Sequence, residues 1–163
     1  MPVQKTLVIG LGNPLLGDDG VGWVIAERLR EVQLLPLDVE IDTLALGGIG
    51  LMERLVGYQR AVIIDALKTG HFPNGSVHSF RLDDLENQFA GHLASAHETN
   101  LQTALEMGRE LGADLPSEVL VVAIESPYIY DFSEQLSPEV ASAVEKAAQL
   151  VSDLLADKKD QEE

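Results

Sequence analysis

Short apolar runs alternate with amphipathic stretches along the chain. Four of the runs are rich in β-branched residues, and the intervals between them have the periodicity of helices. Alternating strands and helices are typical of a parallel sheet, and continuous apolar runs are typical of strands that helices cover on both faces. We therefore predict an α/β fold, a single-domain three-layer α/β/α sandwich with a mostly parallel, twisted sheet of about five strands. The four runs are residues 6–9, 39–44, 61–64 and 119–124.

A further run has a different pattern. Residues 76–82 alternate between apolar and polar side chains, and they follow Pro73-Asn74-Gly75, which favours a turn. Alternation is typical of a strand with one solvated face, so we predict an edge or antiparallel strand here.

Two helix starts are marked by capping residues. Ser95-Ala96-His97-Glu98 has the pattern of a capping box with Ser95 as the N-cap, and the helix that follows is expected to end at Gly112. Ser137-Pro138 places a capping hydroxyl before a proline at the first helical position, and an apolar stripe then extends to Leu154. This second helix is expected to be the last element.

The length of 163 residues suits one domain with one sizeable core. We place that domain at residues 1–156. Residues 157–163 contain no apolar side chain to bury, so they are predicted to form a disordered charged tail.

Composition excludes several classes of function. With 27 acidic and 11 basic residues the formal charge is −16, which disfavours nucleic acid and anionic membrane surfaces as partners. The absence of cysteine removes disulfides, thiolate zinc sites and a cysteine nucleophile. We see neither an apolar run long enough to span a membrane nor a signal peptide, so we expect a cytoplasmic protein. The sequence leaves the oligomeric state open, and a monomer is the default expectation.

The most informative stretch is residues 7–22, which combine a strand, a glycine-rich turn and a helix start. As a dinucleotide-binding fingerprint it lacks the third glycine, because Leu15 stands where Gly or Ala is needed, and Pro14 stiffens the turn. It is not a P-loop either, because no Gly-Lys-Ser/Thr follows and Asp18-Asp19 stands where phosphate would bind.

Two families share parts of this stretch. Gly10-Leu11-Gly12-Asn13-Pro14 resembles the opening of bacterial peptidyl-tRNA hydrolases, but those enzymes continue with a histidine-asparagine pair, so we keep them as a minor alternative. The whole pattern of Gly10, Gly12-Asn13, Leu15, Asp18-Asp19-Gly20 and Gly22 resembles the nickel-iron hydrogenase maturation endopeptidases. Further matches follow in the same order, from about residue 7 to residue 148, at Gly47-Gly48, Gly50, Ile64-Asp65-Ala66 and Ser95-x-His97.

Three of the matching residues are expected to meet at one cleft. Asp19 follows the first strand, Asp65 is expected to end the third strand, and His97 lies in the first turn of a helix. In parallel α/β sheets, ligands bind beyond the carboxyl ends of the strands. Two carboxylates and an imidazole would make an open site for a divalent transition metal. Capping and solvation are the plainer explanations for such residues, and we assign the cap to Asp18.

The resemblance implies a specific activity and a phosphorylase/hydrolase-like fold. Members of the family remove a C-terminal extension from the nickel-iron hydrogenase large-subunit precursor after nickel insertion, and the substrate-bound nickel is the recognition feature. Asp19, Asp65 and His97 would then contact that nickel, while Gly47, Gly48 and Gly50 would let backbone approach the substrate peptide. A non-enzymatic nickel-binding or assembly module is the rival hypothesis for the same residues.

The chain departs from the family pattern at three positions. Leu46 precedes the paired glycines where many relatives have an acidic residue, and Ile49 follows them where those relatives have a hydroxyl residue. Asp19 is shorter by a methylene than the glutamate of some relatives. The other histidines, at positions 71, 78 and 92, lack metal-ligand spacing and are expected to be mostly solvated. No Gly-x-Ser-x-Gly motif supports a serine protease.

Overall fold

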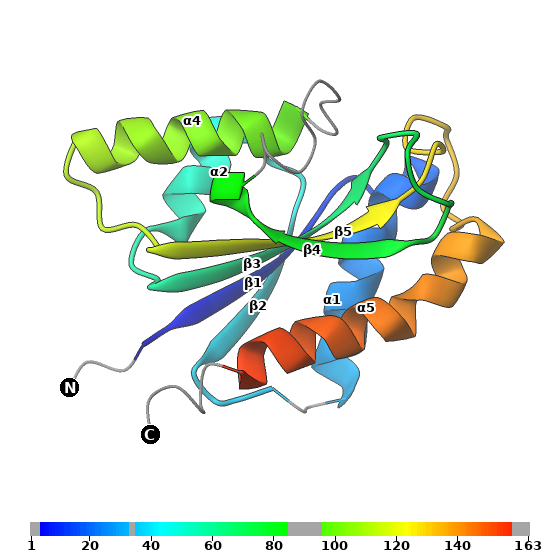
Figure 1. Ribbon diagram of the computed structural model, residues 1–163, viewed down its shortest axis with the longest axis horizontal. Coiled ribbons are helices and arrows are strands. Elements are labelled where there is room, and N and C mark those ends of the chain that lie inside the picture. The colour runs from blue at the N-terminus through cyan, green and yellow to red at the C-terminus, as the bar shows by residue number, and fades with distance from the viewer. Residues whose placement is uncertain (1–3, 33–34, 85–95, 158–163) are drawn as a thin grey trace.

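The computed structural model of the protein describes residues 4–32, 35–84 and 96–157, with only the backbone described for residues 96–100. Its centre is a five-stranded sheet with the order β2-β1-β3-β5-β4 (Figure 1). Four strands are parallel, and β4 pairs antiparallel with β5, so the α/β prediction and the antiparallel edge strand are both confirmed. The strands are β1 (Thr6–Leu11), β2 (Val39–Leu44), β3 (Arg60–Leu67), β4 (Val77–Arg81) and β5 (Glu118–Glu125).

Helices cover both faces of the sheet, as a three-layer sandwich requires. Figure 1 shows α2 and α4 on one side and α1 and α5 on the other. Side chains alternate along each strand, so Leu7 and Ile9 of β1 belong to the core under α2 and α4, while Val8 belongs to the core under α1 and α5. The helices are α1 (Val21–Val32), α2 (Gly48–Leu55), α4 (Ala96–Glu110) and α5 (Pro138–Ala156), with short 3-10 turns η1 (Gly17–Gly20) and η2 (Leu82–Asp84).

The central strand β3 is longer than its apolar run. The sequence predicts residues 61–64, whereas the strand spans Arg60–Leu67 and all of its residues are buried. The charged first residue is tolerated because the Arg60 guanidinium lies 3.1 Å from a Glu118 carboxylate oxygen and donates to the Leu154 carbonyl at 2.8 Å. At the other end, β3 continues past Asp65, so this carboxylate lies within the sheet.

One correction concerns a helix start. Ser137 is the N-cap of α5 with Pro138 at the start of the helix, as predicted, but its hydroxyl makes no cap hydrogen bond and donates to Asp18 at 2.8 Å. The predicted N-cap Ser95 lies outside the described residues, as does the tail from residue 158 onward. The predicted end of the other helix is confirmed: α4 ends at Glu110, and Gly112 follows with a φ of 86°. Within the part of the chain that is described, no helix is both long and apolar enough to span a membrane.

The glycines around β1 allow the first helix to lie directly on the sheet. A Cβ at Gly10 would lie 2.2 Å from the Gly22 carbonyl oxygen, and a Cβ at Gly22 would lie 2.5 Å from the Ile64 carbonyl oxygen. Gly50 is different, because a Cβ there would meet only the Leu46 side chain, at 3.7 Å. Gly10 in β1 and Gly22 in α1 are therefore needed for backbone packing.

Alanine substitutions should separate these two kinds of glycine. Gly10→Ala is expected to destabilise the fold by about 1–3 kcal/mol or more, because the added methyl group meets fixed backbone atoms. Gly50→Ala should be neutral or stabilise by up to about 1 kcal/mol, because alanine has the higher helix propensity. Denaturant unfolding of both variants checks this, and equal stability of the two would contradict the packing argument.

Candidate active site

The ends of β1 and β3 form the point at which the topology of the sheet reverses. From β1 the chain passes through α1 to β2 on one side, and it then returns through α2 to β3 on the other side of β1. The β1–β3 ladder ends at the pair Gly10 and Ile64, while β3 continues alongside β5. Ligands of open α/β sheets bind in the crevice at such a switch point. The sequence-predicted carboxylates lie on the two segments that border it.

Asp65 is a buried carboxylate in the middle layer of the molecule. It pairs with Ala123 of β5 and has no exposed surface. One carboxylate oxygen, Oδ1, accepts a hydrogen bond from the Ala66 backbone N–H at 2.9 Å. The prediction that Asp65 ends the strand is wrong, because the ladder with β5 continues to Leu67. Its position one residue beyond the last β1–β3 pair nevertheless places it at the switch point.

Asp19 lies in η1, on the turn between β1 and α1. Its side chain is half-buried, and Oδ2 accepts a hydrogen bond from the Asn13 backbone N–H at 2.8 Å. The turn is tight enough that a Cβ at Gly12 would lie 1.9 Å from the Asp19 carbonyl oxygen, and Gly12 has a φ of 140°. Because η1 contacts β3, the segments that carry Asp19 and Asp65 are neighbours.

Asp18 has a different role from the one predicted. The N-cap of η1 is Leu16, and no side-chain hydrogen bond caps this turn. The Asp18 side chain is fully buried and accepts hydrogen bonds from the Ser126 hydroxyl, the Ser137 hydroxyl and, at 2.7 Å, the Ser137 backbone N–H. Asp18 therefore joins the loop after β1 to the loop after β5. Sequence reasoning missed this role because neither serine is near Asp18 in the chain.

His97 is the second residue of α4, as the capping pattern predicts. In Figure 1, α4 begins at the end of the molecule at which β1, β3 and β5 finish, because a crossover helix runs antiparallel to its strands. Only the backbone of His97 is among the described parts of the chain. Among the side chains that are described, no group of three or more His, Cys, Asp or Glu residues could hold a metal ion. The triad with His97 therefore stays a prediction.

The other histidines are distributed as follows. His71 is exposed, in agreement with the prediction. His78 is half-buried, which corrects the expectation for this residue: its Nε2 lies 3.0 Å from the Ser76 hydroxyl oxygen, and its ring centroid lies 4.1 Å from that of Phe72. His92 lies outside the described residues.

The glycine segment follows β2 at the same end of the sheet. The last residue of β2, Leu44, accepts hydrogen bonds at its carbonyl from the Gly12 N–H at 3.0 Å and the Trp23 indole N–H at 3.1 Å. Gly47 is exposed, extended and the N-cap of α2, and Gly48 has a φ of 53°. Gly50 lies inside α2. The end of β2, which leads into Gly47 and Gly48, is therefore hydrogen-bonded to the turn between β1 and α1.

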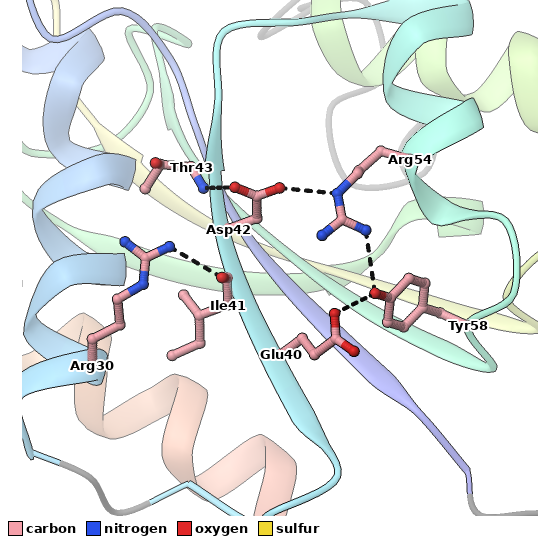
Figure 2. A network of polar contacts seen from close by, with 7 residues as sticks. All are labelled: Arg30, Glu40, Ile41, Asp42, Thr43, Arg54 and Tyr58. Atoms are coloured by element: carbon pink, nitrogen blue, oxygen red, sulfur yellow. Dashed lines mark hydrogen bonds and ion pairs between the residues drawn. The ribbon is translucent and has the colours of Figure 1, made fainter.

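A polar network anchors α2 to the edge strand β2 and so positions these glycines. Figure 2 shows Arg54 between Asp42 and Tyr58, with N–H donors 2.9 Å from the Asp42 carboxylate and 3.2 Å from the Tyr58 hydroxyl. The Tyr58 hydroxyl in turn donates to Glu40 at 2.5 Å. The hydrogen bonds to Tyr58 and Asp42 raise the pKa of Arg54 above its ordinary value, against the opposing effect of burial. Arg54 therefore keeps its charge throughout the working pH range.

Comparison with known proteins decides the family. A model of the hydrogenase maturation protease family matches residues 24–154. The chain belongs to this family. Among curated members, the hydrogenase expression/formation protein HupD of Rhodobacter capsulatus is 28% identical over 94% of this chain and 72% of its own length. The hydrogenase 2 maturation protease of Escherichia coli is 27% identical over 91% of this chain and 88% of its own length.

Solved structures of hydrogenase maturation proteases share the fold. The hydrogenase maturating endopeptidase HybD of E. coli superimposes with a TM-score of 0.80 at 26% identity, over 95% of this chain and 94% of that one. The [NiFe] hydrogenase maturation protease HybD of Thermococcus kodakarensis gives a TM-score of 0.72 at 26% identity, over 93% and 99% of the two chains. The protein is accordingly an endopeptidase of hydrogenase maturation, which agrees with the enzyme prediction and not with a non-enzymatic module or a peptidyl-tRNA hydrolase.

Proposed function

We propose that this endopeptidase removes the C-terminal extension of a nickel-iron hydrogenase large-subunit precursor after nickel insertion, in the cytoplasm, and recognises the nickel in that substrate. The observation that carries the proposal is Asp65, a fully buried carboxylate within a central strand at the topological switch point of the sheet. Burying a carboxylate is costly, so an apolar residue would serve the fold better at this position. Asp18 is equally buried, but its carboxylate joins two loops through Ser126 and Ser137, whereas we attribute the burial of Asp65 to function.

The ligand set suits nickel carried by the substrate. In this proposal Asp19 and Asp65 contribute carboxylate oxygens and His97 contributes an imidazole nitrogen, each from a different element. Such mixed oxygen and nitrogen sites bind divalent transition metals. The placement of Asp19 on a turn that contacts β3, and of His97 in the first turn of α4, supports a common cleft.

The chemistry is addition of water across one peptide bond. The oxygen of water bonds to the carbonyl carbon, the C–N bond breaks, and the proton released by water reaches the departing amine. A carboxylate of the Asp19–Asp65 pair would accept that proton and deliver it, which makes the enzyme aspartyl in type. Substrate-bound nickel supplies a Lewis acid near the scissile carbonyl. In this proposal the substrate peptide contacts the backbone at Gly47, which is exposed and extended.

Mass spectrometry of a co-expressed large subunit tests the proposal. With this protein and nickel both present, the precursor is expected to lose one C-terminal peptide, and the two fragment masses should sum to that of the precursor plus one water. A precursor purified from nickel-free cells should stay at full length, because the recognition feature is missing. Cleavage that is independent of nickel, or an uncut precursor held in a stable complex, would contradict the proposal.

A further inference from the structure

Large exposed apolar side chains gather on two loops beside the candidate site. Leu15 on the loop after β1 is 53% exposed, and Tyr128, Tyr130 and Phe132 on the loop after β5 are 48%, 74% and 90% exposed. We call these four residues the aromatic platform. Large apolar side chains exposed together on neighbouring loops are typical of binding surfaces, and tyrosine is enriched at the centres of such surfaces.

The platform is held in place by backbone hydrogen bonds between its two loops. Ser133 donates its N–H to the Leu15 carbonyl at 3.0 Å and accepts at its own carbonyl from the Gly17 N–H at 2.7 Å. The Asp18 N–H donates to the Tyr128 carbonyl at 3.2 Å, and the buried Asp18 carboxylate holds Ser126 and Ser137 at the two ends of the second loop. A loop that is ordered before binding loses less entropy when a partner docks.

The platform is also continuous with the candidate site. Asn13 accepts the Leu15 N–H at its side-chain oxygen at 2.9 Å and donates its own N–H to the Asp19 carboxylate at 2.8 Å. One turn therefore connects an exposed platform residue to a proposed nickel contact. A protein seated on the platform would have its neighbouring segment at the cleft.

Charge selects the kind of partner. The loop after β5 also carries the exposed acidic residues Asp131 and Glu134, and the whole chain has a formal charge of −16. This charge repels anionic membranes and a second copy of the same chain. Lys68 lies with its Nζ 5.7 Å from the Tyr130 ring centroid, so one basic group already contacts the platform. A protein surface with an apolar centre and basic residues around it complements these features.

We infer that the aromatic platform is the docking surface for the protein substrate, and that it contacts an apolar, basic-rimmed patch next to the segment to be cleaved. This inference rests on the proposed function for the identity of the substrate. It predicts that most of the binding affinity comes from contacts away from the scissile bond.

The test compares two double variants with the nickel-loaded large-subunit precursor. Tyr130→Ser with Phe132→Ser removes the two most exposed platform side chains. Leu37→Ser with Leu111→Ser is the matched control, because these residues are 106% and 86% exposed and lie on other loops. In the platform variant, the Kd measured by calorimetry and the KM are both expected to rise at least tenfold. The kcat should stay within twofold of wild type. In the control variant, Kd, KM and kcat should all stay within twofold of wild type. Added salt should weaken the binding of the wild-type protein to the precursor, because the charges of the two surfaces attract.

Binding and cleavage are scored separately so that the two proposals can fail independently. Precursor that binds through the platform but stays uncut would contradict the proposed function and leave the docking surface in place. Precursor that is cut with the same Kd and KM by wild type and platform variant would overturn the docking surface. The docking surface would also be overturned if the wild-type protein formed a dimer in ultracentrifugation and the platform substitutions abolished that dimer. Binding of the wild-type protein to phosphatidylglycerol vesicles, lost in the platform variant, would overturn it in the same way.

Discussion

Asp65→Asn is expected to lower the rate of precursor shortening by about 10²–10⁴-fold, the range typical of removing a group that transfers protons. The fold should survive, because asparagine has nearly the same size and its side-chain oxygen can still accept the Ala66 N–H, now 2.9 Å from Oδ1. Single-turnover mass spectrometry gives the rate, and thermal unfolding reports the fold. The loss belongs to the chemical step, so it should remain when the precursor is in excess.

Asp153→Asn is the matched control for this prediction. It makes the same chemical change on an exposed face near the end of α5, where Asp153 contacts only the Gln149 side chain among the side-chain hydrogen bonds described. Its rate should stay within about twofold of wild type, because exposed polar contacts contribute little. An Asp65→Asn variant that processes the precursor as fast as Asp153→Asn would remove Asp65 from the mechanism.

Asp18→Ala is expected to destabilise the protein by about 3 kcal/mol, because it removes a buried acceptor of three hydrogen bonds and leaves the Ser137 N–H without its partner. For a chain of this size each kcal/mol lowers Tm by roughly 2–4 °C. Thermal unfolding followed by circular dichroism measures the shift. The physical reason is that this buried carboxylate accepts every side-chain hydrogen bond described between the loops after β1 and β5, which backbone hydrogen bonds also join.

Two further variants identify the cause of that loss. Asp18→Asn should be milder than Asp18→Ala, because the amide keeps a carbonyl acceptor for the Ser137 N–H. Asp19→Ala should cost only about 1 kcal/mol, since it removes one partly buried hydrogen bond from Asn13, yet it should abolish processing. Equal stability of Asp18→Ala and Asp19→Ala would show that burial does not separate the roles of these adjacent residues.

The fold could be predicted from the sequence where the signal is local. Apolar runs in β1, β3 and β5 indicated buried parallel strands, and the alternation in β4 indicated the edge strand, because side-chain direction follows directly from backbone periodicity. The bounds of β3 were predicted too short at both ends. Arg60 and Asp65 interrupt the apolar pattern, and their places in the strand depend on contacts with β5 and α5.

The candidate site was predictable to a different extent at each residue. Asp19 and Asp65 were selected because they match the family pattern and because a parallel topology brings the segments after strands to one edge of the sheet, and the structure places both residues near that edge. Their roles at a metal stay a prediction. The helical position of His97 was also predicted correctly. The role predicted for Asp18 was wrong, because a pair of adjacent aspartates at a helix start has the same local pattern whichever of the two is buried.

By itself, then, the sequence determined the kind and order of the elements and the residues available for chemistry, because periodicity, capping and turn chemistry act over a few neighbouring residues. The tertiary structure alone decided that Asp18 is buried and holds two loops together. Its partners Ser126 and Ser137 lie 108 and 119 residues further along the chain. Contacts over such separations depend on how the strands are ordered in the sheet, and that order is set by packing of the whole core.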